Sequence, residues 1–145
     1  MSVHKQWLEK IASFKARSNL TLPPPSLAEL KLEYTEIEPK KSMQAKLPFQ
    51  KRFTNPLGVY QGGFLAAAID EVFGPLSYLT AEGPCMTLSM NLTFLRPFTE
   101  QMGHCLIQAK VLKESQNFIF MRAEVVSLDG ELLAHSESHV TKVKA

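Results

Sequence analysis

Two groups of residues near the middle of the chain have the types and spacing needed for chemistry at a carbonyl carbon. Gly62 and Gly63 stand immediately before a long apolar segment, and Asp70 and Glu71 interrupt that segment. Glycines at a helix start leave backbone amides unobstructed at the positive end of the helix dipole, where oxyanions and polarised carbonyls bind. A carboxylate supplies the complementary part, a general base or a nucleophile.

Asp70 is the stronger candidate acid because its neighbours Ile69 and Val72 are apolar. An unpaired carboxylate inside an apolar helix carries a large desolvation penalty unless it borders a cavity or meets donors, and such groups are often functional. Two structural interpretations remain open: both acids could form an exposed patch at a helix kink, and the paired glycines could serve only a tight turn. Glu71, about 100° further around the helix, is the alternative acid.

The spacing of the two groups bears on assembly. Gln61 and Asp70 are nine positions apart, which is about 13.5 Å along a helix axis and on opposite faces at roughly 100° per residue. One helix therefore cannot bring both side chains to one bond. If both act on the same substrate atom, two copies must contribute, and a homodimer is the smallest working unit.

The central apolar segment predicts a buried helix over residues 62–80, because it has almost no polar face at any period. Pro75 removes one backbone amide, so this helix is expected to kink or end near Gly74. Residues 86–96 alternate between apolar and polar side chains and predict a half-buried strand. Further strands are expected over residues 104–112, 117–128 and 131–143, with Asp129 and Gly130 as the turn between the last two.

The first fifty residues predict one helix and two strands. Apolar residues recur at helical spacing from Val3 to about Arg17, and the proline run at 23–25 closes off this amphipathic helix as a peripheral addition. Residues 27–38 and 43–50 are expected to be strands. Two strands, one buried helix and four more strands predict an α+β fold in which an antiparallel sheet of about six strands wraps around one long central helix.

Composition narrows the function classes. The 145 residues are 45% hydrophobic with a formal net charge of +2, which predicts one domain and makes nucleic acid an unlikely partner. No segment is apolar enough to span a membrane, so a cytoplasmic location is expected by default. Cys85 and Cys105 are expected to be buried free thiols. His135 and His139, four apart in a strand, would lie about 13 Å from each other, so no metal site is expected.

The pattern of Asn55, Gln61, Gly62, Gly63 and Asp70, followed by the strand at 87–97, resembles hotdog-fold acyl-CoA thioesterases of the phenylacetate-degradation type, in the 4-hydroxybenzoyl-CoA thioesterase superfamily. The resemblance covers roughly Leu47 to the C-terminus. It implies a hotdog domain over residues 23–145, with residues 1–22 as the extra N-terminal helix and linker.

The resemblance also implies roles for individual residues. The Gly62 amide would hold the thioester carbonyl, and Asp70 of a neighbouring subunit would act as general base or nucleophile. Asn55 would orient groups around the site, and Thr87 matches a hydroxyl position near the attacking water.

Four further residues complete the expected site. Gln61 stands where the family often has His, and its amide can hydrogen-bond a carbonyl but cannot shuttle a proton near neutral pH. Gly63 and Glu71 are expected beside the substrate. Arg96 is a candidate contact for CoA phosphates, although an Arg at a strand end is more often simply solvated.

Hydrolysis of an acyl-CoA to free acid and CoA, by a homodimer or dimer of dimers without metal or redox cofactor, is the preferred hypothesis. The alternative, motivated by Gln61, is a hotdog protein that binds acyl-CoA as a sensor or carrier without turnover. A dehydratase is a weaker third possibility, because the predicted helix contains no His to pair with the acid.

Overall fold

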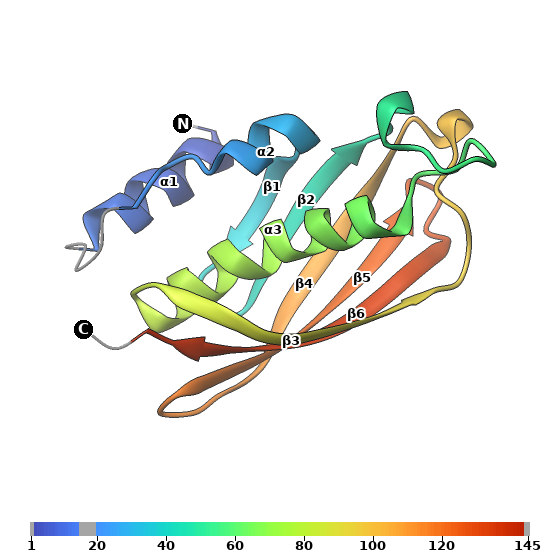
Figure 1. Cartoon of the computed structure of the whole chain (residues 1–145). Helices are drawn as coiled ribbons and strands as arrows, with labels where there is room; N and C mark the ends of the chain where they lie inside the picture. Colours follow the sequence, from blue (N-terminus) through green and yellow to red (C-terminus); the bar gives the residue numbers. More distant parts are fainter. Residues whose placement is uncertain (1, 15–19, 144–145) are drawn as a thin grey trace.

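The computed structural model describes residues 2–14 and 20–143, and its central feature is one six-stranded antiparallel sheet with the order β1-β2-β4-β5-β6-β3. The long helix α3 lies along one face of this sheet, and α1 and α2 lie beside the half of the sheet that begins with β1 (Figure 1). The expected α+β hotdog architecture with an extra N-terminal helix is therefore confirmed. The strands are β1 (Glu33–Glu38), β2 (Ser42–Pro48), β3 (Cys85–Phe94), β4 (His104–Glu114), β5 (Phe118–Ser127) and β6 (Leu132–Lys142).

Helix α3 (Gly62–Ala81) begins where the sequence predicts and continues past Pro75. Pro75 has no amide to donate to the carbonyl of Glu71, but the Tyr34 hydroxyl donates to that carbonyl at 2.6 Å instead. The expectation that the helix could end near Gly74 is thus wrong, because a side chain of β1 satisfies the carbonyl that the proline leaves free. The helix ends at Glu82, which adopts a left-handed conformation.

One prediction about α3 needs correction: the helix is not buried on every side. Most of its apolar side chains pack against the sheet, but a stripe at helical spacing is exposed in the single chain. The exposed stripe consists of Gly63, Phe64, Ala67 and Asp70. Asp70 therefore does not carry the desolvation penalty predicted for a fully enclosed helix. The small side chains that suggested burial leave this face open to another molecule.

The segment predicted as a strand over 27–38 is in fact a helix followed by a strand. Helix α2 (Pro25–Leu30) starts with proline at its first position, which suits a helix start, and Leu27 and Leu30 face the core one turn apart. Lys31 then turns the chain with a positive φ of 54° into β1. Helix α1 (Val3–Ser13) buries its own apolar face at Trp7 and Ile11. Residues 15–17 of the predicted first helix lie outside the described residues.

Strand β3 keeps the predicted alternation only in its second half, where Met90 and Leu92 are partly buried against the core, whereas Met86 and Leu88 are exposed. A register shift between Thr87 and Ser89 breaks the expected alternation, so Met86 and Met90 lie on opposite faces of the sheet. Only Cys85 is buried in the single chain. β3 is an edge strand that pairs with β6 alone, which leaves a ten-residue edge without a partner strand among the described residues.

In the described part of the chain, no helix is long and apolar enough to cross a membrane, and no cluster of three potential metal ligands occurs. His139 instead lies 2.8 Å from the Ser89 hydroxyl, measured from Nδ1, and stacks against Phe120. Both Cys85 and Cys105 are buried and unbridged.

Candidate active site

The start of α3 presents two free backbone donors. Gln61 caps the helix, since its side-chain oxygen accepts from the Phe64 amide at 3.2 Å and its carbonyl accepts from the Phe64 and Leu65 amides. The amides of Gly62 and Gly63 have no acceptor among the described residues. They are therefore available to a ligand oxygen, at the positive end of a 20-residue helix.

Gly62 also lies close to a neighbouring aromatic ring. A Cβ added at this position would lie 3.0 Å from the ring of Phe94. Phe94 is 53% exposed, so its ring lies at the surface beside the free amides. The side-chain oxygen of Gln61 is engaged by the Phe64 amide, so the group that Gln61 could offer to a substrate carbonyl is its side-chain NH2.

The loop before α3 is held by Asn55. Its side-chain oxygen accepts from the backbone amides of Leu57 at 3.0 Å and Val59 at 3.1 Å. Its backbone N–H donates to the Val59 carbonyl. These bonds close the loop, and Gln61 then donates its amide to the Phe53 carbonyl at 2.8 Å. Asn55 thus shapes the loop that leads to Gly62.

A hollow of about 350 Å³ adjoins these residues, and its lining includes Asn55, Gly62 and Arg96. The structure therefore brings three predicted site residues to one place. The Arg96 guanidinium, however, already pairs with the Glu131 carboxylate. A phosphate at Arg96 would have to compete with this ion pair.

The predicted acids lie further along α3. Asp70 is exposed and accepts a hydrogen bond from the Thr87 hydroxyl at 3.1 Å, which fixes the carboxylate against β3. Glu71 is half buried and accepts from the Ser26 hydroxyl of α2. Burial raises the pKa of the Glu71 carboxyl; the Ser26 hydrogen bond opposes this rise and the neighbouring Asp70 charge adds to it. Asp70, Glu71 and Thr87 line a second cavity, of about 370 Å³.

Within one chain, the donors and the acid do not meet. Gly62 and Asp70 are eight positions apart on α3, a separation of about 12 Å along the axis. Gly62 lines one hollow and Asp70 the other.

Sequence reasoning missed two residues that contact Glu71. Ser26 donates to the Glu71 carboxylate across 45 positions of sequence, and Tyr34 donates to the Glu71 backbone carbonyl across 37 positions. Tyr34 becomes a visible candidate only if Pro75 is interpreted as leaving a carbonyl that needs a donor.

Comparisons with known proteins identify the family of this chain. The family model described as thioesterase superfamily matches residues 57–134, more than half of the chain. A search of curated proteins gives no significant match.

Several solved structures are similar over nearly their whole length. The PaaI protein from the phenylacetic acid degradation operon of E. coli superposes with a TM-score of 0.81 at 14% identity, covering 100% of this chain and 98% of the other. A phenylacetic acid degradation-related protein of Ralstonia eutropha gives 0.75 at 25%, covering 91% and 98%. A mutant of the phenylacetic acid degradation protein PaaI from Thermus thermophilus gives 0.73 at 24%, covering 83% and 100%.

The resemblance inferred from the glycine pair and Asp70 is confirmed by these matches. The family match includes both the free amides at the start of α3 and the carboxylate held by Thr87. This chain belongs to the thioesterase superfamily and has the hotdog fold of the phenylacetate-degradation type.

Proposed function

We propose that the protein hydrolyses acyl-CoA thioesters as a homodimer, with the Gly62 amide of one copy and Asp70 of a second copy acting on the same carbonyl. The observation that carries this proposal is the separation of the two groups on one helix, about 12 Å at 1.5 Å per residue. The Gly62 amide can donate to a carbonyl oxygen and the Asp70 carboxylate can act as base or nucleophile, but within one chain they cannot act on the same atom. Membership of the thioesterase superfamily supports thioester hydrolysis as the general chemistry.

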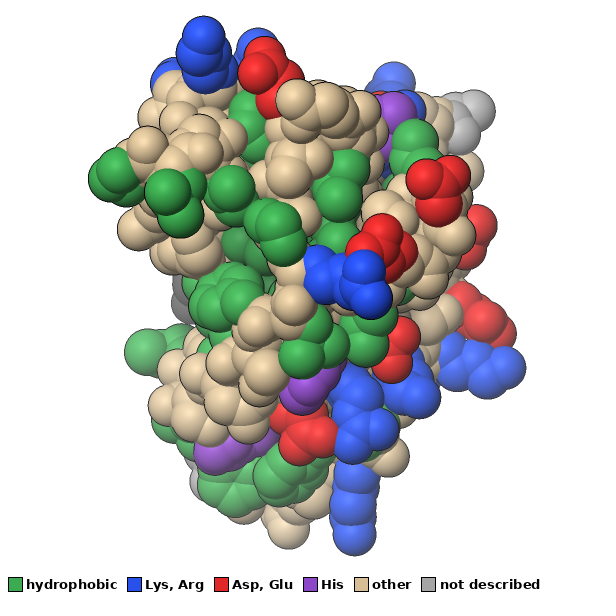
Figure 2. Space-filling view, turned by 90° about the vertical axis from the view of Figure 1, so that its right-hand side faces the viewer, with side chains coloured by type: hydrophobic (Ala, Val, Ile, Leu, Met, Phe, Trp, Pro, Cys, Tyr) green, Lys and Arg blue, Asp and Glu red, His purple; other side chains and the backbone are tan. Residues whose placement is uncertain are grey.

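The free edge of β3 supports the dimer. An exposed edge strand pairs readily with another strand, and this edge carries exposed Leu88 and Phe94. Figure 2 views the protein from the end at which α3 begins: charged side chains are frequent toward the right of the view, and hydrophobic ones toward the left. Pairing β3 with its copy across a two-fold axis would place the two α3 helices antiparallel over one continuous sheet. The start of one helix would then approach the middle of the other.

The chemistry follows from the two groups. Amide donors at Gly62 stabilise the oxyanion that forms as the thioester carbonyl is attacked. Asp70 either removes a proton from the attacking water or attacks the carbonyl itself to form an anhydride that water then hydrolyses. In both routes the CoA thiolate leaves and takes up a proton. Thr87 holds the Asp70 carboxylate in position.

Thiol release from a panel of acyl-CoAs tests the proposal. The panel includes phenylacetyl-CoA, because related structures carry the name of phenylacetic acid degradation, and straight-chain acyl-CoAs from acetyl to decanoyl. We expect stoichiometric release of thiol and free acid from at least one of them. Tight binding of an acyl-CoA by calorimetry without any thiol release would instead favour the alternative, a non-catalytic sensor or carrier.

A further inference from the structure

The cavity beside Asp70 is formed partly by the N-terminal segment, which lies outside the family match. Its described walls come from α1, the segment at 20–24, α3 and the start of β3. One side of the lining is apolar, with Trp7, Ile11, Leu20, Leu22, Tyr78 and Cys85, and the other carries the polar groups of Thr21, Asp70, Glu71 and Thr87. This cavity, called the chamber below, therefore places an apolar wall beside the predicted catalytic carboxylate.

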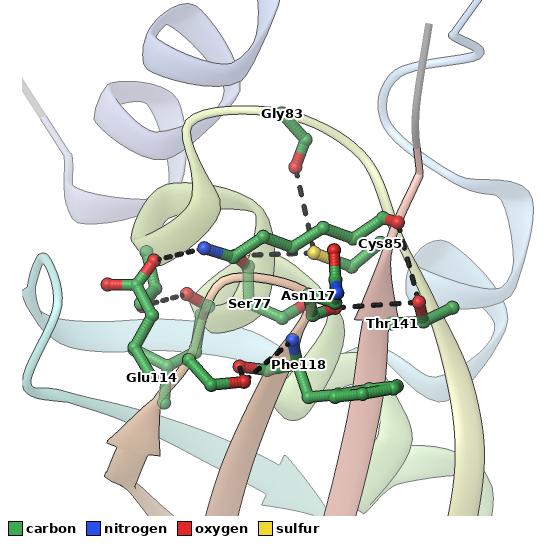
Figure 3. Close-up of polar contacts among 11 residues, drawn as sticks. Ser77, Gly83, Cys85, Glu114, Asn117, Phe118 and Thr141 are labelled. Atoms are coloured by element: carbon green, nitrogen blue, oxygen red, sulfur yellow. Dashed lines mark hydrogen bonds and ion pairs between the residues drawn. The ribbon is translucent and has the colours of Figure 1, made fainter.

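The wall at Cys85 is firmly fixed. Figure 3 shows the Cys85 thiol lying between the Ser77 carbonyl, at 3.6 Å, and the Gly83 carbonyl, at 3.9 Å, where α3 turns into β3. Lys142, the neighbour of Cys85 across β3 and β6, forms an ion pair with Glu114 of β4 at 2.7 Å. This end of the cavity is thus built from several elements that hold one another in place.

The charges around the cavity select which part of an acyl-CoA can enter. No Lys or Arg is among the described lining residues, and Asp70 and Glu71 both contribute carboxyl groups. The phosphates of CoA would be repelled by these carboxylates, and Lys142 beside Cys85 is already paired with Glu114. An uncharged apolar acyl group would bury its surface against the chamber walls.

Gly74 is the residue that keeps the chamber open. Apart from its chain neighbours, a Cβ added to Gly74 would have no described atom within 4 Å, and Gly74 lines the cavity. Glycine inside a helix costs about 1 kcal/mol relative to alanine, but here it also avoids the crowding between a Cβ and the ring of the following Pro75. Because Gly74 lines the cavity, a larger side chain at this position would take up part of its volume.

We propose that this chamber binds the acyl group of the substrate and that Gly74 sets the length of acyl group it accepts. The inference rests on the proposed function for the reaction, but it adds the substrate class. A cavity of about 370 Å³ can hold an acyl chain rather than an acetyl group alone. The expected substrates are therefore neutral acyl groups of medium length, without a carboxylate at the far end.

Two variants at Gly74 and one matched control test this. Gly74→Ala and Gly74→Leu fill the chamber in two steps, and thermal unfolding confirms that each variant is folded. Gly83→Ala is the control, because its added Cβ also has nothing within 4 Å but Gly83 does not line the cavity. For Gly74→Leu, we expect kcat/KM for decanoyl-CoA to fall at least about tenfold while that for acetyl-CoA stays within about twofold. Gly74→Ala should show a smaller shift in the same direction.

A matched pair of substrates tests the charge rule. Wild-type protein should prefer hexanoyl-CoA to adipoyl-CoA, which ends in a carboxylate. An unchanged chain-length profile in Gly74→Leu, an equal shift in Gly83→Ala, or a preference for adipoyl-CoA would overturn the proposal.

The acyl-binding proposal and the proposed hydrolysis can fail independently, and the experiments distinguish the two failures. If no acyl-CoA on the panel releases thiol, the proposed function fails. Calorimetric binding of decanoyl-CoA then still decides the chamber: a loss of at least about tenfold in affinity in Gly74→Leu, absent in Gly83→Ala, supports it. Equal affinities in all three proteins would overturn it.

Discussion

The two halves of the candidate site on α3 are built in different ways. The donor end is local: the cap of Gln61 on Phe64 and the bonds of Asn55 span at most four positions of sequence. The acid region is assembled from distant segments: Thr87 reaches Asp70 across 17 positions, and Ser26 reaches Glu71 across 45. These hydrogen bonds of the donor end therefore form within one loop and helix start, whereas those of the acids form only when distant segments fold together.

The largest effect is expected at the acid. Asp70→Asn keeps the shape and an oxygen that can accept from Thr87 but removes the charge, so kcat should fall about 10⁴-fold, at the upper end for loss of a general base. Asp129→Asn, at an exposed turn, is the matched control and should leave kcat unchanged. Circular dichroism and thiol release measure both variants. Full activity in Asp70→Asn would exclude Asp70 as the catalytic carboxylate and make Glu71 the candidate.

The donor end can be tested by removing the backbone N–H of Gly62. Gly62→Pro deletes the amide donor at the first helical position, where proline is favoured, and Gln61 already has the extended backbone that precedes a proline. We expect kcat to fall about 10²-fold with little loss of stability. Gly62→Ala adds the same Cβ beside Phe94 but keeps the amide. An equal loss in both variants would assign the effect to the Phe94 contact rather than to the donor.

The loop that supports the donor end should contribute less. Asn55→Ala removes two accepted hydrogen bonds, and we expect a loss of about 1 kcal/mol in the free energy of unfolding and a decrease in kcat/KM smaller than that of Gly62→Pro. Asn91→Ala removes a comparable bond to the Glu137 amide, at 3.1 Å, on β3. Asn91→Ala, the control, should lower the free energy of unfolding but leave kcat/KM unchanged. A change in stability alone in both variants would make Asn55 structural only.

The smallest effect concerns pH. Burial gives Glu71 a raised pKa in the folded protein, so the folded state binds more protons than the unfolded state between the ordinary carboxyl pKa of about 4.5 and the folded pKa. The stabilisation by protonated Glu71 is present below this window and is lost as pH rises through it. Melting temperatures of wild type and Glu71→Gln should therefore diverge in favour of the variant as pH rises. A constant difference between pH 4 and 8 would contradict this.

The same comparison explains what the sequence could predict. Gly62, Gly63 and Asp70 were identifiable because helix starts and acids within apolar runs carry their meaning locally. The sequence predicts a strand over 27–38 because apolar and polar residues alternate there, but this alternation belongs to β1. For the helix at 25–30, the only local signal is Pro25 at its start. The exposure of Asp70 could not be predicted, because small side chains on α3 suit either a core or a surface that awaits a second copy. The chamber at Gly74 depends on the N-terminal segment folding back.

The most direct test of the central claim uses two inactive variants together. Gly62→Pro and Asp70→Asn subunits carrying different tags are co-expressed, and the mixed dimer is isolated by both tags. In that dimer one site combines an intact Gly62 amide from one copy with an intact Asp70 from the other, so thiol release should recover to about half the wild-type rate per dimer. A mixed dimer as inactive as the two parents would contradict a site shared between subunits.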